Sequence, residues 1–208
     1  GVKIMKIAVM GAGGVGGYFG ARLAAANHEV SFIARGAHLN AIQDKGLKVE
    51  SLCGNIDLPN VKATDNPSDI GPVDVVIFAV KLGDMEEAAK DCSPLLGENT
   101  AVIPFLNGVD APATLTKLLG PKYACGGVTY IFSSISSPGC IHHIGKFARL
   151  VFGELDGRPS KRLKAFEAAC SHSGIESLLS DDIMGAIWEK FSVLVPLSGI
   201  TASARSPI

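Results

Sequence analysis

This 208-residue sequence has almost no excess of charge: 19 basic and 20 acidic residues give a formal net charge of −1. A chain without a basic excess has no strong electrostatic attraction for nucleic acid or for an anionic membrane surface, so we expect neither partner. It also lacks an apolar run of the roughly 18 residues that a membrane span needs. Its N-terminus has no signal-peptide pattern. These absences predict a cytoplasmic protein.

Cysteine is scarce and scattered. The sequence has no C-x-x-C pair and no spacing typical of a metal site at its five cysteines, Cys53, Cys92, Cys125, Cys140 and Cys170. We therefore expect reduced thiols. His142 and His143 are adjacent, but neighbours along a strand point to opposite faces and no third ligand accompanies them. The sequence predicts no metal site.

Glycine, by contrast, is abundant, and its most informative cluster lies near the N-terminus. A short apolar strand runs into a turn with G-x-G-x-x-G spacing, and a helical segment follows. The turn is Gly11-Ala12-Gly13-Gly14-Val15-Gly16. In such a turn the first glycine permits the bend, the second lets the backbone approach a pyrophosphate, and the third lets the helix pack close to the strand. The helix would direct its positive end at the phosphates. This pattern predicts a dinucleotide site, although an ordinary strand-to-helix turn is the alternative.

The end of the next expected strand, over 29–34, bears on the choice of dinucleotide. A site that prefers NAD places Asp or Glu about 20 residues beyond the glycines, where it binds the ribose 2′-hydroxyl. This sequence has Arg35 there instead. A guanidinium group suits a 2′-phosphate, so the sequence favours NADP. A solvated arginine at a strand end is the alternative.

Two later strands also end in polar residues. Residues 73–80 form an apolar run, interrupted only by Asp74, that ends at Lys81, as expected of a central parallel strand covered on both faces. A helix is expected over 85–96, and a further strand over 100–106 ends at Asn107. Because the carboxyl ends of parallel strands border the ligand crevice, Lys81 is placed to bind a cofactor phosphate or ribose, and Asn107 offers a donor and an acceptor. The alternatives are a lysine that begins a solvated helix and an asparagine that serves an Asn-Gly turn.

The rest of the chain predicts an antiparallel strand pair over 126–134 and 139–154, a helix over 160–170, and a last helix after 181–182. Lys190, Leu194 and Ser198 would share one face of that last helix. Trp188 and Phe191 flank the lysine. Loss of hydration there would lower the pKa of Lys190 and suit it to donate a proton. A lysine that keeps its charged end in water is the alternative.

In chain order, these motifs resemble those of the ketopantoate reductase (2-dehydropantoate 2-reductase) family over nearly the whole sequence. The motifs are the glycine turn, Arg35, Ala79-Val80-Lys81, Asn107-Gly108-Val109, the stretch from Gly139 to Gly145, and Ile187-Trp188-Glu189-Lys190. By that resemblance Lys190 would be the catalytic lysine, and Arg35 and Lys81 would bind the phosphates of NADPH. Asn107 would lie between nicotinamide and substrate, and His143 would have a structural role.

Two features depart from the family pattern. The family usually carries asparagines four and eight positions after its lysine, where they hold the substrate, whereas this sequence has Leu194 and Ser198. Leucine cannot form a side-chain hydrogen bond, so the substrate differs or its polar group is held elsewhere, and Ser198 stays a candidate substrate ligand. The sequence also stops at Ile208, before the family's C-terminal helical segment with its substrate-binding glutamate and serine.

The sequence thus predicts a doubly wound, Rossmann-type α/β domain over 5–180, with a parallel sheet and an antiparallel finish. The first helix of a helical substrate domain would follow over 181–208. The resemblance implies NADPH-dependent reduction of 2-dehydropantoate to pantoate, in pantothenate biosynthesis, with a homodimer as one open arrangement. Two rivals remain open. One is a reductase or dehydrogenase of another 2-oxo or hydroxy acid on the same scaffold, and the other is a non-catalytic domain that senses a dinucleotide.

Overall fold

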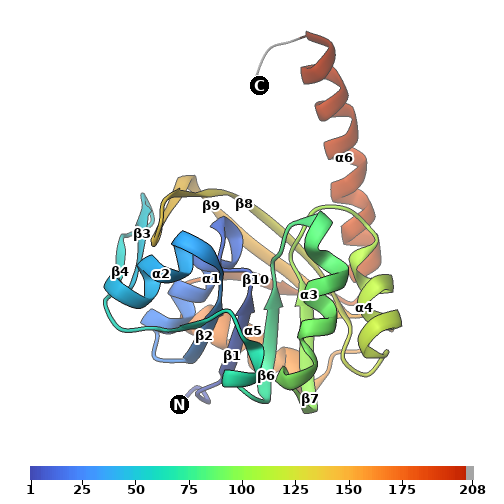
Figure 1. Ribbon diagram of the computed structural model, residues 1–208. Coiled ribbons are helices and arrows are strands. Elements are labelled where there is room, and N and C mark those ends of the chain that lie inside the picture. Colours follow the sequence, from blue (N-terminus) through green and yellow to red (C-terminus); the bar gives the residue numbers. More distant parts are fainter. Residues whose placement is uncertain (205–208) are drawn as a thin grey trace.

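The computed structural model describes the backbone of residues 1–204 and the side chains of residues 1–194. Its centre is a five-stranded sheet in the order β5-β2-β1-β6-β7, in which every paired strand is parallel to its neighbour (Figure 1). The strands are β1 (Lys6–Met10), β2 (Glu29–Ile33), β5 (Lys62–Thr64), β6 (Val73–Phe78) and β7 (Leu96–Pro104). The predicted doubly wound parallel sheet is confirmed.

This sheet is buried on both faces because alternate residues of its central strands enter two different cores. Ile7 and Val9 of β1 pack into a core with α1 (Gly14–Ala25) and α5 (Lys161–His172). Ala8 and Met10 face the opposite core, with α3 (Met85–Asp91) and α4 (Ala111–Leu119). Both faces therefore need apolar side chains, which explains why the segment over 73–80 is apolar apart from Asp74 near its start.

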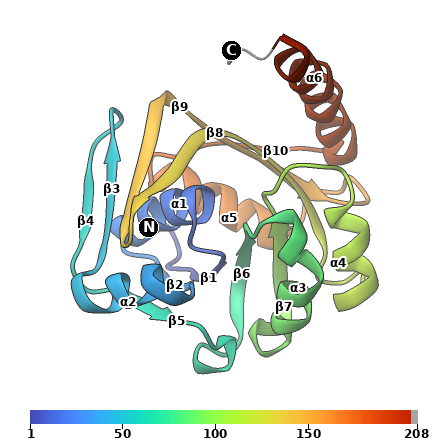
Figure 2. The ribbon, with the colours of Figure 1, turned by 45° about the horizontal axis from the view of Figure 1, so that its top comes forward.

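The antiparallel strand pair is also confirmed, but it belongs to a second sheet. β8 (Cys125–Ser137) pairs antiparallel with β9 (Cys140–Glu154), and β9 pairs in parallel with β3 (Leu47–Ser51) and with β10 (Glu176–Leu179). The short β4 (Ile56–Leu58) adds to the edge of β3. Helices α1 and α5 fill the space between the two sheets (Figure 2).

The last helix, α6 (Ile183–Ala204), begins against the second sheet and then extends away from the rest of the chain (Figure 1). Ile183 and Ile187 pack with Val128 and Val151 in a small third core. Farther along, the side chains of Trp188 and Val193 are 51% and 58% exposed. This helix therefore leaves apolar surface exposed. The domain boundary near residue 180 stays a prediction. None of the helices in the part of the chain that the structure describes is long and apolar enough to cross a membrane.

Several elements differ from the sequence expectation. The helix expected over 85–96 ends at Asp91, because Pro94 lies in a separate 3-10 turn, η3 (Ser93–Leu95), that leads directly into β7. Helix α2 (Gly36–Lys45), helix α4 and strand β10 had not been predicted. Two further 3-10 turns are η1 (Pro67–Asp69) and η2 (Leu82–Asp84).

Candidate dinucleotide and substrate site

The candidate site lies where the carboxyl ends of four neighbouring strands meet. The glycine turn follows β1, Arg35 lies just beyond β2, Lys81 just beyond β6 and Asn107 just beyond β7. Because β2 and β6 flank β1 on opposite sides, the chain reverses its winding direction at β1, which is where ligands bind in open α/β sheets. The fold therefore brings all four sequence-predicted features to one edge of the parallel sheet.

The glycine turn has the geometry that its spacing predicts. Gly11 has φ +95°, and a Cβ atom there would lie 2.6 Å from the carbonyl oxygen of Ala79. A Cβ atom on Gly16 would overlap the carbonyl oxygen of Gly11 and press on Val9, so this glycine lets α1 approach β1. Gly13 has no atom within 4 Å of the position a Cβ would take. The turn is thus tight at its first and third glycines and open at its second.

The N-terminus of α1 is suited to an anion. The helix begins after Gly13, no side chain caps it, and its first turn carries no acid. The N–H groups at this end of a helix lack carbonyl partners within the helix and carry its positive partial charge. These N–H groups fit the phosphate-binding role predicted for the turn, which stays a prediction for Gly13, Gly14, Val15 and Gly16.

Arg35 has a partner that the sequence analysis did not foresee. Its Nη2 lies 2.9 Å from Oδ2 of Asp84, at the end of the 3-10 turn that follows Lys81. The Arg35 side chain is 73% exposed, so this ion pair is weak, with a typical contribution of about 0–1 kcal/mol. Lys81, which directly precedes this 3-10 turn, is also exposed. The pair holds the guanidinium near the strand ends without using its full hydrogen-bonding capacity.

Lys190 reaches back from α6 to the parallel sheet. Its Nζ donates to Oδ1 of Asn107 at 3.2 Å and to the carbonyl oxygen of Thr129, and it lies 5.2 Å from the centre of the Tyr130 ring. Thr129 and Tyr130 belong to β8, and burial of Lys190 against this strand lowers its pKa from the ordinary value. The structure thus joins the two residues that the sequence assigned to chemistry and substrate contact, although 83 positions separate them.

Leu194 also belongs to this region. A small depression beside Lys190 is lined by Asn107 and its neighbours, by Gly127 and Val128 of β8, and by Ile187, Phe191 and Leu194 of α6. The first departure from the family pattern therefore lies at the candidate substrate site itself. The other candidate, Ser198, lies outside the residues whose side chains the structure describes.

His143 lies away from this edge and holds the second sheet together. It is 2% exposed, its Nδ1 lies 2.8 Å from Oγ of Ser51, and its Nε2 lies 3.1 Å from the carbonyl oxygen of Phe147. Both ring nitrogens therefore have partners within the fold, in keeping with a structural role. No cluster of His, Cys, Asp or Glu that could hold a metal ion occurs among the described side chains.

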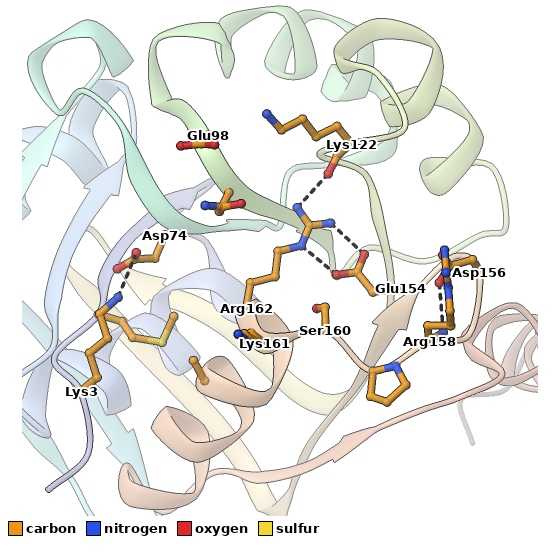
Figure 3. Close-up of a pocket in the computed structure, with 14 residues that line it drawn as sticks. Lys3, Asp74, Glu98, Lys122, Glu154, Asp156, Arg158, Ser160, Lys161 and Arg162 are labelled. Atoms are coloured by element: carbon orange, nitrogen blue, oxygen red, sulfur yellow. Dashed lines mark hydrogen bonds and ion pairs between the residues drawn. The ribbon is translucent and has the colours of Figure 1, made fainter.

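A larger hollow lies at the opposite, amino-terminal end of the parallel strands (Figure 3). At its centre Arg162 forms a bidentate pair with Glu154, with N···O distances of 2.7 and 2.8 Å, and donates to the carbonyl oxygens of Thr100 and Lys122. These bonds tie α5 to β7, β9 and the segment before β8. The guanidinium is fully engaged, so we assign Arg162 to the stability of the fold.

Comparison with known proteins gives a consistent result. A family model described as ketopantoate reductase PanE/ApbA matches residues 7–157. A 2-dehydropantoate 2-reductase of Mesorhizobium japonicum is 32% identical over 98% of this chain and 69% of its own length. The crystal structure of 2-dehydropantoate 2-reductase from Porphyromonas gingivalis superposes with a TM-score of 0.91 at 34% identity, over 99% of this chain and 74% of that one.

A solved relative with a different name is also similar. A ternary structure of D-mandelate dehydrogenase with NADH and anilino(oxo)acetate has a TM-score of 0.78 at 25% identity, over 89% of this chain and 60% of that one. The present chain spans about two thirds of the length of the curated relatives that it matches.

Proposed function

We propose a reaction for this chain from the premise that it belongs to the ketopantoate reductase PanE/ApbA family, a family of oxidoreductases. The reaction is the reduction of the 2-oxo group of 2-dehydropantoate to pantoate, with NADPH as the hydride donor. The observation that carries this proposal is the contact between Lys190 and Asn107 at the carboxyl edge of the parallel sheet. It brings a lysine of lowered pKa next to the expected nicotinamide end of a dinucleotide site.

The residues at the sheet edge fit a dinucleotide. The uncapped N-terminus of α1 and the open space at Gly13 would accept the pyrophosphate. Arg35 would hold the 2′-phosphate of the adenosine ribose and Lys81 would bind a cofactor phosphate, since both are exposed cations beyond the ends of β2 and β6, the two strands that flank β1. When bound, the cofactor supplies the hydride, and the protein supplies binding, orientation and electrostatics.

Lys190 would supply the proton. Its Nζ is held by two oxygen acceptors, and a third hydrogen-bond donor remains in an ammonium group for the oxygen of a substrate carbonyl. A positive charge at that oxygen stabilises the alkoxide that develops during reduction, and the lowered pKa eases the transfer of the proton to it. The Asn107 amide would orient the lysine and the substrate.

A second candidate reaction is the reduction of another 2-oxo acid, or the oxidation of the corresponding hydroxy acid. Leu194 favours it, because an apolar side chain lines the depression beside Lys190 where the family usually has an asparagine. The similarity to a D-mandelate dehydrogenase is consistent with an apolar substrate group. A dinucleotide-sensing domain without chemistry is less well supported, since it gives no reason for the contacts of Lys190.

We keep a cytoplasmic location, a homodimer and the absence of nucleic-acid or membrane partners as expectations.

A substrate panel tests the proposal. The natural protein that contains this chain would be assayed for NADPH oxidation with 2-dehydropantoate, and with 2-oxo acids that carry aromatic or aliphatic groups. We expect turnover with 2-dehydropantoate and an increase in kcat/KM for it in Leu194→Asn. If an apolar 2-oxo acid has the higher kcat/KM and Leu194→Asn lowers it, the second candidate is correct. If no 2-oxo acid oxidises NADPH, both enzyme proposals fail.

A further inference from the structure

His38, in the first turn of α2, links the glycine turn to the hairpin between β8 and β9. Its Nε2 lies 2.6 Å from the carbonyl oxygen of Ala12, and its Nδ1 lies 3.0 Å from the backbone nitrogen of Gly139. The Gly139 N–H can only donate, so Nδ1 must be the unprotonated acceptor. The ring proton is therefore on Nε2, which donates to Ala12. The surrounding backbone selects one tautomer of this histidine.

The bond to Ala12 fixes the direction of the next N–H in the turn. The carbonyl of Ala12 and the N–H of Gly13 belong to one planar trans peptide, so they point in opposite directions. When His38 holds the Ala12 oxygen, the Gly13 N–H must point away from His38. The N–H groups of Gly11 and Ala12 both donate to the carbonyl oxygen of Ile33, so they face β2. Gly13 is thus the first residue of the turn whose N–H is not bonded to β2, and a Cβ atom on Gly13 would have no other atom within 4 Å.

The hairpin turn gives His38 a fixed support on its other side. The carbonyl oxygen of Gly139 accepts the N–H of Lys48 at 2.9 Å, so this residue is bonded to β3 as well as to His38. Gly139 has φ +79°, and a Cβ atom there would lie 3.2 Å from Cβ of Ala41 on α2. The turn is therefore close-packed against the helix that carries His38, and the Nδ1 bond has little freedom to shift.

We propose that His38 is a positioning residue that aims the Gly13 N–H at the pyrophosphate of the bound dinucleotide. The hairpin turn at Gly139 holds its ring in the required orientation and tautomer. This inference rests on the proposed dinucleotide function, but it concerns a residue that contacts the turn and not the cofactor. It predicts that the affinity for the cofactor depends on the His38–Ala12 bond itself and not on the stability of α2.

Two substitutions at His38 separate these bonds. In His38→Asn the amide oxygen can replace Nδ1 and accept from Gly139, but the side chain is too short to reach Ala12. In His38→Gln the longer side chain brings an N–H donor to the place of Nε2, so the bond to Ala12 is restored. Gln43→Leu is the matched control, since Gln43 of α2 also donates to a backbone carbonyl, that of Ala63, at 3.0 Å.

The test is the Kd for NADPH, measured by calorimetry, together with the Tm of each ligand-free variant. We expect His38→Asn to weaken NADPH binding about 10-fold, because the Gly13 N–H would lose its hydrogen bond to the charged pyrophosphate. The Tm should stay close to that of the wild type. His38→Gln should recover most of the affinity, and Gln43→Leu should bind as the wild type does.

Three results would overturn the inference. An unchanged Kd in His38→Asn would show that the Ala12 bond does not orient the turn. If His38→Gln binds NADPH as weakly as His38→Asn while its Tm equals that of the wild type, the bond from Nε2 to Ala12 is not the cause of the lost affinity. A similar loss of affinity in Gln43→Leu would indicate a general effect of α2. If the wild-type protein binds neither NADPH nor NADH, the proposed dinucleotide function fails. If it binds NADPH and the His38 variants give one of the three results above, only the inference about His38 fails.

Discussion

The preference for NADPH over NADH should depend on Arg35 and should be limited by Asp84. A 2′-phosphate that accepts from the Arg35 guanidinium gains a hydrogen bond to a charged group, typically about 1.5–3 kcal/mol. At 1.4 kcal/mol per factor of ten, this corresponds to a preference of about 10- to 150-fold. The existing Arg35–Asp84 pair must be loosened first, which costs about 0–1 kcal/mol for an exposed pair.

Two variants should change the Kd for NADPH in opposite directions. Arg35→Ala should weaken NADPH binding by the full preference and leave the Kd for NADH nearly unchanged. Asp84→Asn should tighten NADPH binding by up to about fivefold, because the carboxylate no longer competes for the guanidinium. Isothermal calorimetry with both cofactors at low and high salt gives the four constants for each protein. Salt should reduce the preference, since the interacting groups are exposed.

Equal wild-type affinities for the two cofactors would refute the assignment of Arg35 to the 2′-phosphate. So would an Arg35→Ala variant that keeps the preference. Tighter NADH binding in the wild type would show that the arginine serves the Asp84 pair alone, and the cofactor of this protein would then be NAD.

Three further outcomes follow from the packing and the pKa shifts. Gly16→Ala should lower the Tm sharply or abolish NADPH binding, because its Cβ would overlap the carbonyl oxygen of Gly11. Arg162→Met leaves Glu154 buried without its partner and should cost about 3–5 kcal/mol in urea unfolding at neutral pH. Burial raises the pKa of Glu154, but the hydrogen bonds from Arg162 and Ser160 outweigh it and hold the pKa below its usual value. The wild type should therefore lose this stability as pH falls through the folded-state pKa of Glu154. In Arg162→Met the free energy of unfolding should depend less on pH over the same acidic range. Burial lowers the pKa of Lys190, so kcat should fall with rising pH below the ordinary lysine pKa; a pH profile that is flat through that range would contradict its role as acid.

The parallel sheet could be predicted from the sequence because its central strands are largely apolar segments bounded by glycine or polar residues. The ends of those runs also located Lys81 and Asn107, since parallel strands bring their carboxyl ends to one edge. Helix α2 escaped prediction because it buries only Leu39 and Ile42, too few residues for a recognisable apolar stripe. Strand β10 has four residues that are half-buried or exposed, and its identity as a strand comes from pairing with β9.

The partners of the site residues could not be read from the sequence for a different reason. Asp84 is 49 positions from Arg35, and Tyr130 belongs to a strand 60 positions before Lys190; neither spacing follows from a local pattern. The sequence attributed the dehydration of Lys190 to the flanking Trp188 and Phe191. The structure adds β8, where Thr129 accepts from Nζ and Tyr130 packs over it, while Trp188 is half exposed. Tertiary pairing of this kind becomes visible only once the strands and α6 are placed.

The central claim is that Lys190 performs chemistry beside the nicotinamide end of the cofactor, whereas the affinity for the cofactor comes mainly from the glycine turn that binds its pyrophosphate. The most direct test is kcat for 2-dehydropantoate reduction in Lys190→Met of the natural protein, measured beside the Kd for NADPH. Lys164→Met, which removes an exposed lysine of α5, is the matched control. The account predicts a fall in kcat of about 10²–10⁴-fold, the range for a lost general acid, with the Kd for NADPH nearly unchanged. Wild-type turnover in Lys190→Met, or a loss of NADPH affinity as large as the loss of kcat, would contradict it.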